Sequence, residues 1–326
     1  MIEMVTNDAI IKAAKRLKGK IVRTPLLKSD DVNKELKSNI YIKAENLQTI
    51  GAFKFRGAMN TILQLPPDVK KVVAWSSGNH AQAVAAAANI TEREATIVMP
   101  KDSPKTKLNG TIAWGAKIVK YDRNTENREE IGKAIAKEQN AIIIPPFDDV
   151  NVIIGQGTTG LEAVEQLKEI NVIPDIVLCC CGGGGLIAGV STSIKANYPN
   201  AQIYSVEPEN FDDTKKSLEA DMIVENTMQH LSICDALLAN KPGNITFEIN
   251  RKILSGGISV SDTESLIAMK IAYKYFKIVL EPGGAVALAA AISKKIDIKN
   301  KNVLVIASGG NVDSDIFEKC LYAESF

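Results

Sequence analysis

The stretch Ile176-Val177-Leu178-Cys179-Cys180-Cys181-Gly182-Gly183-Gly184-Gly185-Leu186 decides the fold class. Its first six residues are apolar, which is typical of a strand buried on both faces of a parallel sheet. A helical pattern over residues 186–196 follows at once, so the four glycines form a turn from a strand into a helix. Backbone N–H groups at such a turn are unobstructed by side chains, and this arrangement favours binding of a phosphate group.

Short β-rich runs alternate with helical patterns over the rest of the chain, which favours a doubly wound α/β architecture. A helix is expected over residues 8–17, where apolar residues recur on one face. Another is expected from Asp262 to about Val279, because Ser261 and Glu264 form a capping-box pattern. Strands are expected at residues 40–43, 72–75, 95–99, 117–121, 141–144, 176–181, 203–206 and 302–307.

Composition excludes several functional classes. The 326 residues include 39 basic and 38 acidic side chains, so a strongly basic nucleic-acid-binding protein is excluded. The two histidines, His80 and His230, exclude a histidine-rich metal centre. Three of the five cysteines are adjacent in an apolar run, which indicates reduced thiols in a cytoplasmic protein. We expect no signal peptide and no membrane association, since the apolar runs are too short to span a bilayer.

Two further glycine-containing junctions contain candidate functional residues. In residues 51–58, Lys54 stands near the expected start of a helix, where the helix dipole and desolvation would depress its pKa. A neutral amine is what Schiff-base chemistry requires, although a solvated lysine is the ordinary alternative. The turn Ser76-Ser77-Gly78-Asn79-His80 follows an expected strand and could hold a carboxylate or only cap a helix.

The glycine loop alone leaves its ligand open. No Gly-Lys-Ser/Thr follows the glycines, so a Walker-type nucleotide loop is excluded. A dinucleotide site remains an alternative, because Gly183-x-Gly185-x-x-Ala188 fits a loose Rossmann pattern and Glu207 stands about twenty residues further on. That alternative explains neither Lys54 nor the serine-rich turn.

Taken together, these junctions resemble the serine/threonine dehydratase family of pyridoxal-phosphate enzymes, which includes serine racemase. The resemblance extends over nearly the whole chain. It implies fold type II, which is similar to the tryptophan synthase β subunit and has two open, twisted, mostly parallel sheets flanked by helices. The matching segments are residues 43–46 with 51–58, 76–82, Pro100 with Lys107, 155–158, 182–186, 281–285 and 308–311.

The resemblance implies a role for each candidate residue. Lys54 would be the Schiff-base lysine, Phe53 would pack against the cofactor ring, and Asn79 would contact the ring oxygen. Ser308 would face the pyridine nitrogen and leave it unprotonated, which favours elimination over transamination. The cofactor phosphate would be held by Gly182, Gly183, Gly184, Gly185 and Leu186. The substrate carboxylate would be held by Ser76, Ser77, Gly78, Asn79 and His80.

The expected activity is elimination of water and ammonia from L-threonine, L-serine or 3-hydroxyaspartate to give a 2-oxo acid. An amino-acid racemase with side elimination is the alternative, because Ser77 matches the serine that acts on the opposite face of the cofactor in serine racemase. A non-catalytic regulatory relative is a third hypothesis, against which the intact Lys54 and glycine loop argue. Cys234-Asp235-Ala236 departs from the usual Ala-Asp-Gly and leaves the substrate open.

A divalent-cation site is also implied by the resemblance. Its ligands would be Glu207, the backbone carbonyl of Phe211 and Asp213, and such oxygen ligation suits Mg²⁺, Ca²⁺ or Mn²⁺. Residues 1–68 and 148–326 would form a large cofactor-binding domain, and residues 69–147 a small mobile domain that closes over the substrate. We further expect a homodimer and no C-terminal regulatory domain.

Overall fold

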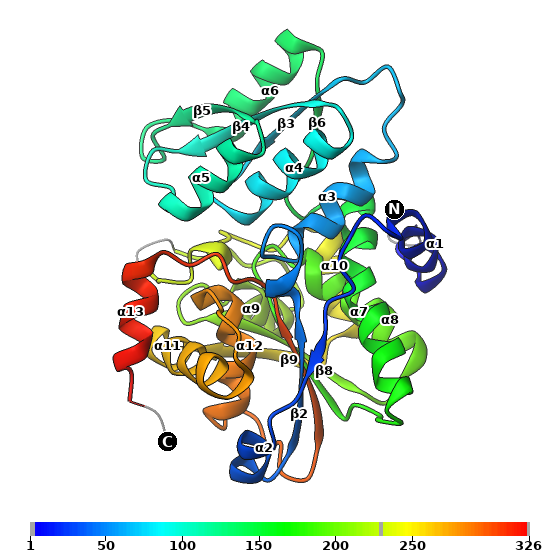
Figure 1. Cartoon of the computed structure of the whole chain (residues 1–326), viewed down its shortest axis with the longest axis vertical. Helices are drawn as coiled ribbons and strands as arrows, with labels where there is room; N and C mark the ends of the chain where they lie inside the picture. Colours follow the sequence, from blue (N-terminus) through cyan, green and yellow to red (C-terminus); the bar gives the residue numbers. More distant parts are fainter. Residues whose placement is uncertain (1–3, 228–230, 325–326) are drawn as a thin grey trace.

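The computed structural model describes residues 4–227 and 231–324, so His230 lies outside the described residues. Its strands form two separate sheets, drawn one above the other in Figure 1. Within the described residues, every strand pair is parallel except the first, β1 with β2. The predicted α/β class with two mostly parallel sheets is therefore confirmed.

The smaller sheet has the strand order β5-β4-β3-β6, and α4, α5 and α6 are drawn with it at the top of Figure 1. These elements run without interruption along the chain. The strands are β3 (Lys71–Trp75), β4 (Glu94–Pro100), β5 (Lys117–Tyr121) and β6 (Ile142–Ile143), and the helices are α4 (Asn79–Ile90), α5 (Lys105–Ala113) and α6 (Arg128–Gln139). All of them fall within residues 69–147, although the division into domains stays a prediction.

The larger sheet has the order β1-β2-β10-β7-β8-β9, so the last strand of the chain lies near its centre. Its strands are β1 (Leu26–Leu27), β2 (Asn39–Ala44), β7 (Ile176–Cys180), β8 (Gln202–Pro208), β9 (Gly256–Val260) and β10 (Asn302–Ala307). The accompanying helices are α1 (Asn7–Leu17), α2 (Asp30–Leu36), α3 (Lys54–Ile62), α7 (Val150–Glu169), α8 (Gly185–Asn197), α9 (Asp213–Ala220), α10 (Asn244–Ile253), α11 (Asp262–Ile271), α12 (Pro282–Ile292) and α13 (Ser314–Tyr322).

The core explains why most of the predicted strands are apolar throughout. Helix α12 is buried along its whole length and belongs to the same apolar cluster as β7 and β10. A helix that is apolar all round can be stable only when it is covered on every side. Both α12 and α8 contact β7, so this strand is covered by helices, as a continuous apolar strand requires.

Two details differ from the sequence expectations. The capping box at Ser261 and Glu264 is present, but α11 ends at Ile271 and continues as one π-helical turn to Phe276. The following Lys277 has φ +58° and terminates the segment before Val279. Strand β9 was not predicted because it begins with Gly256 and Gly257, and glycine usually weakens strands.

Candidate active site

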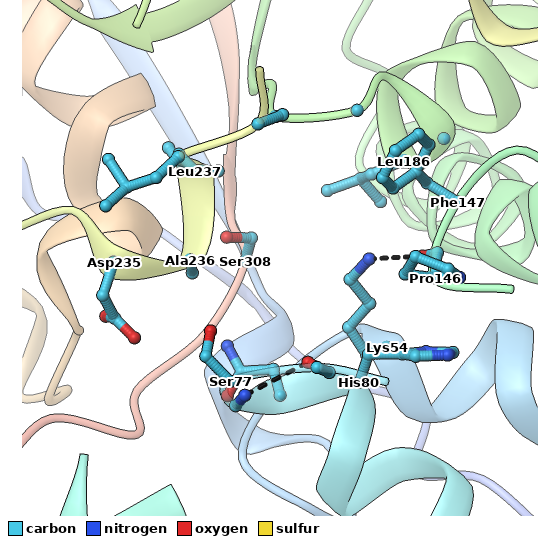
Figure 2. A pocket seen from close by; sticks show the side chains of 18 of the residues that line it. Lys54, Ser77, His80, Pro146, Phe147, Leu186, Asp235, Ala236, Leu237 and Ser308 are labelled. Atoms are coloured by element: carbon cyan, nitrogen blue, oxygen red, sulfur yellow. Dashed lines mark hydrogen bonds between the residues drawn. The ribbon is translucent and has the colours of Figure 1, made fainter. Parts of the chain in front are cut away.

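A single pocket collects residues from the carboxyl ends of strands in both sheets. It contains the end of β3 with the following turn, the end of β7 with the glycine loop, and Ser308 just after β10. Ligands bind at this edge in open α/β sheets. Figure 2 shows side chains from these segments around one common space. All predicted cofactor and substrate residues line this pocket: Phe53, Lys54, Ser76, Ser77, Gly78, Asn79, His80, Gly182, Gly183, Gly184, Gly185, Leu186 and Ser308.

Lys54 is the first residue of α3, as predicted, and its side chain projects into the pocket. Its Nζ donates a hydrogen bond to the backbone carbonyl of Pro146, with an N–O distance of 2.6 Å. Burial lowers the pKa of Lys54 to about 8. A substantial fraction of the amine is therefore neutral near physiological pH, which is the form that reacts with a carbonyl group.

The glycine loop forms the predicted turn into α8, whose first residue is Gly185. Gly184 caps the helix with φ +89°, a conformation that strongly favours glycine. A Cβ atom at Gly183 would overlap the ring of Phe147, so a larger residue does not fit there. Within the described part of the chain, no backbone carbonyl accepts a hydrogen bond from the N–H groups of residues 182–184. These N–H groups are therefore free to bind an anion.

The turn at residues 76–80 leads from β3 into α4, which begins at Asn79. His80 is buried, and its Nε2 lies 2.9 Å from the carbonyl oxygen of Ile144. Burial, with Lys54 nearby, lowers the pKa of His80 to about 3, so the imidazole is neutral. His80 therefore adds no positive charge to this turn, and a bound carboxylate would depend on neutral donors there.

Ser308 and Phe53 are joined through the backbone. The N–H of Phe53 donates to the carbonyl of Ser308 at 3.0 Å, and Ala52 forms an isolated bridge with Gly309. Ser308 itself is 5% exposed and borders the pocket. This pairing places the segment that carries Lys54 beside the end of β10, although 255 or more residues separate them in sequence.

Comparison with known proteins decides the family. Residues 17–309 match the family model described as pyridoxal-phosphate dependent enzyme. The chain belongs to this family. Pyridoxal phosphate is therefore its cofactor, and the predicted fold type II and the dehydratase-family resemblance are confirmed.

Three relatives illustrate the similarity. The chain is 40% identical to the L-threo-3-hydroxyaspartate ammonia-lyase of Saccharomyces cerevisiae, covering 94% of each protein. It is 39% identical to the serine racemase of Schizosaccharomyces pombe, again covering 94% of each. The solved structure of maize serine racemase superposes with a TM-score of 0.90 at 35% identity, covering 97% of each chain.

The pocket has the chemistry that a pyridoxal-phosphate dependent enzyme requires. The glycine loop at residues 182–185, with unobstructed backbone N–H groups, lies at the start of α8. The half-buried Lys54, whose pKa is lowered, lies in the same pocket. Residues that would hold the cofactor are thus Lys54 for its aldehyde carbon and Gly182–Gly185 for its phosphate. These individual roles remain predictions.

Sequence reasoning assigned no role to several residues of the pocket. Phe147 lies against the glycine loop, while Arg128, Lys107 and Asp235 supply charged groups to the lining. Arg128 is the first residue of α6, where a positive charge opposes the helix dipole. That unfavourable placement is the one sequence signal that could have indicated a function for Arg128.

The predicted cation ligands lie outside this pocket. Glu207 and Asp213 are fully buried, and burial and proximity to Asp213 raise the pKa of Glu207 well above its usual range. The carboxylate of Glu207 accepts backbone N–H groups of Thr214 and Lys215, whereas Asp213 Oδ2 has no hydrogen-bond partner in the described structure. Among the described residues no cluster of three or more metal-binding side chains is found. A cation there would need backbone or solvent oxygens, and Glu207, Phe211 and Asp213 remain a predicted site.

Proposed function

We propose that the protein catalyses β-elimination from a hydroxy amino acid, giving a 2-oxo acid and ammonia. The observation that carries this proposal is the single pocket in which the Lys54 amine, the glycine loop and the residue 76–80 turn meet. The hydroxyl group leaves as water, and a second water later replaces nitrogen at Cα and releases ammonia. No oxidant or reductant is needed, because the β-carbon is reduced as Cα becomes oxidised.

Lys54 and the turn at residues 76–80 would have different roles in this reaction. When bound, pyridoxal phosphate supplies the electron sink that allows the Cα proton to leave. Lys54, whose amine is held in a buried site, would accept that proton. The hydroxyl and N–H groups of the residue 76–80 turn would hold the substrate carboxylate, so that the Cα–H bond faces Lys54.

Among the candidate substrates, we propose 3-hydroxyaspartate, which carries a second carboxylate. Among the residues that the structure describes, Lys54, Lys107 and Arg128 are the cationic side chains that line the pocket. Lys107 is already neutralised by Asp235 and Glu281, and Lys54 is the proposed base. Arg128 makes no ion pair with any residue of the described structure, and it is therefore available for the second carboxylate of the substrate. The similarity to L-threo-3-hydroxyaspartate ammonia-lyases supports the same choice.

An assay of 2-oxo acid release from 3-hydroxyaspartate, L-serine and L-threonine tests the substrate. We expect Arg128→Met to lower kcat/KM for 3-hydroxyaspartate by about 10- to 150-fold, the range for one charge-assisted hydrogen bond, with little change for L-serine. The matched control is Arg123→Met, since Arg123 is exposed and pairs with Asp102. Equal losses for both substrates would rule out Arg128 as the specificity determinant.

Replacement of Lys54 tests the reaction itself. Lys54→Ala should abolish 2-oxo acid release and the visible absorbance of the lysine-bound cofactor, whereas Lys101→Ala, at an exposed position, should leave both unchanged. Retention of lyase activity with normal absorbance in Lys54→Ala would contradict the proposal.

Racemisation is the second candidate, because Ser77 lines the same pocket as Lys54 and carries a hydroxyl group. Ser77→Ala should abolish conversion of L-serine to D-serine while much of the elimination from the L-isomer persists. Chiral chromatography measures the first activity and 2-oxo acid release the second. Equal loss of both would contradict a separate role for Ser77.

Within the described residues, no helix is long and apolar enough to span a membrane. A homodimer remains our proposal from the family resemblance, and a cytoplasmic location remains our proposal from the buried, reduced cysteines. Sedimentation of the cofactor-loaded protein tests the first, and a monomer at micromolar concentration would contradict it. Fractionation of cells tests the second, and recovery of the protein outside the cytoplasm would contradict it.

A further inference from the structure

A chain of polar side chains runs across one side of the pocket. Lys107 Nζ lies 2.7 Å from an Asp235 oxygen and 2.7 Å from Glu281 Oε2. The other oxygen of Glu281 accepts a hydrogen bond from Asn79 Nδ2. Lys107 belongs to α5, beside the smaller sheet, whereas Asp235 and Glu281 belong to segments beside the larger sheet. The ion pairs therefore connect the two sides of the pocket.

Burial makes these contacts interdependent. Lys107 and Glu281 have side chains only 1% exposed, and a buried charge without a partner is strongly unfavourable. Burial alone would lower the pKa of Lys107, but Glu281 and Asp235 together raise it to about 12. Burial raises the pKa of Glu281, and Lys107 opposes this shift. Lys107 thus keeps its charge and is the cation that balances Glu281.

Two glycines leave room for the side chains of Lys107 and Glu281 beside the predicted site. A Cβ at Gly78 would lie 2.5 Å from Lys107 Cδ, so the lysine stem passes directly against the substrate-binding turn. A Cβ at Gly309 would overlap Glu281 Oε1, so the carboxylate lies against the residue that follows Ser308. The ion pair is therefore packed between the turn on one side and the end of β10 on the other.

The amide of Asn79 is held at both ends. Glu281 accepts from its Nδ2, and Asn311 Nδ2 donates to its Oδ1 at 2.9 Å. Glu281 can only accept while it is ionised, which fixes the amide with Nδ2 toward it. Asn79 is the residue expected to contact the ring oxygen of the cofactor, so the charge on Glu281 controls the orientation of that contact.

We propose that Lys107 is a positioning residue, which acts through Glu281 to orient Asn79 and through Asp235 to hold the residue 234–238 segment at the pocket. The proposal deepens the proposed function and rests on it for the identity of the reaction. Lys107 pairs with Asp235 and Glu281, and its stem packs against the turn at Gly78. Its effect on catalysis is transmitted by charge, so it is separable from a purely steric contribution of its stem.

A double-mutant cycle with Lys107→Met and Glu281→Gln tests the transmission by charge. Lys107→Met leaves Glu281 buried without its cation, and we expect kcat to fall at least tenfold and the affinity of the apoprotein for pyridoxal phosphate to fall at least fivefold. In the double variant, the glutamine that replaces Glu281 is uncharged and needs no cation, and its side-chain oxygen still accepts from Asn79. Both quantities should therefore recover to within about threefold of the unmodified protein. Lys105→Met, at an exposed position of the same helix, is the matched control and should change neither.

Asp235→Asn tests the contribution of the Lys107–Asp235 pair separately from that of the Lys107–Glu281 pair. It leaves the Lys107–Glu281 pair intact, so KM should rise while cofactor affinity and its visible absorbance stay unchanged. A double variant no better than Lys107→Met would show that only the packing of the lysine stem matters, and would overturn the proposal. A Lys107→Met variant that behaves like Lys105→Met would also overturn it.

Cofactor affinity is measured without any amino acid, so it also separates this proposal from the proposed function. If the unmodified protein releases no 2-oxo acid from any hydroxy amino acid, the proposed function fails. The cycle in cofactor affinity then still confirms or overturns the positioning role of Lys107.

Discussion

Arg56→Met should lower the thermal unfolding midpoint of the cofactor-loaded protein by about 4–7 °C. Arg56 lies in α3, two residues after Lys54, and its guanidinium is fully buried. It forms paired hydrogen bonds of 2.7 and 2.8 Å with Glu45 and two more, both of 2.8 Å, with Glu162. Lys43 also pairs with Glu162, whereas Arg56 is the one ion-pair partner that Glu45 has among the described residues.

The magnitude follows from the loss of that partner. Removing one partner of a buried ion pair costs about 3–5 kcal/mol, because an uncompensated charge stays buried. An unfolding entropy of about 2.1 cal/mol/K per residue gives about 0.7 kcal/mol/K for a chain of 326 residues. Dividing the cost of the lost ion pair by this unfolding entropy gives the expected shift of about 4–7 °C in the unfolding midpoint. Methionine keeps the apolar stem of the side chain, so the change is mainly one of charge and hydrogen bonding.

Differential scanning calorimetry at a fixed, saturating cofactor concentration measures the shift. The matched control is Arg23→Met, because Arg23 forms a 2.6 Å pair with Glu169 at the surface, where such pairs contribute little. Adding Glu45→Gln to Arg56→Met should recover part of the loss, because no buried carboxylate is then left without a cation. Equal shifts for Arg56→Met and Arg23→Met would refute the reasoning.

Three further predictions concern the cofactor and cation sites. Because burial lowers the pKa of Lys54 to about 8, its neutral fraction grows as pH rises. The rate of cofactor attachment to the apoprotein should therefore rise about tenfold from pH 7 to pH 9 and then level off; a hundredfold rise without a plateau would indicate an ordinary lysine. Gly183→Ala should weaken cofactor binding more than Gly182→Ala, because a Cβ at Gly183 would overlap Phe147, whereas a Cβ at Gly182 would lie 3.4 Å from its nearest neighbour. Equilibrium titration of the two apoproteins with pyridoxal phosphate ranks their affinities. The reverse order would contradict the assignment of residues 182–185 as the phosphate-binding loop. Chelation should lower the unfolding midpoint and Mg²⁺ or Ca²⁺ should restore it, with no such effect in Asp213→Asn; an unchanged midpoint in fully stripped protein would contradict the cation site.

The sequence was sufficient to predict local elements but not the contacts between distant segments. Most of the eight predicted strands were identified because buried parallel strands are continuous apolar runs, whereas β1 has only two residues and β9 begins with glycines. Lys54 was identified because a lysine at a helix start is unusual. In contrast, Lys107 and Asp235 are 128 residues apart, and nothing local to either indicates that they meet.

The charge state and orientation of side chains in the pocket also depend on contacts between distant segments. The pattern at residues 76–80 predicted a carboxylate-binding turn, but it did not reveal that His80 is neutral. Only burial, with the proximity of Lys54, determines the charge state of that imidazole. Likewise, the amide orientation of Asn79 depends on Glu281 and Asn311, which follow it by more than 200 residues.

The central place of β10 in the larger sheet has a consequence for biosynthesis. Strands β2 and β7 flank β10, so the sheet has a gap until residues 302–307 have left the ribosome. The smaller sheet, complete by residue 143, can form much earlier, because its strands are contiguous in sequence. Ser308 follows β10 directly, so the nascent chain cannot assemble the pocket, or trap free pyridoxal phosphate in it, before more than 300 residues have been synthesised.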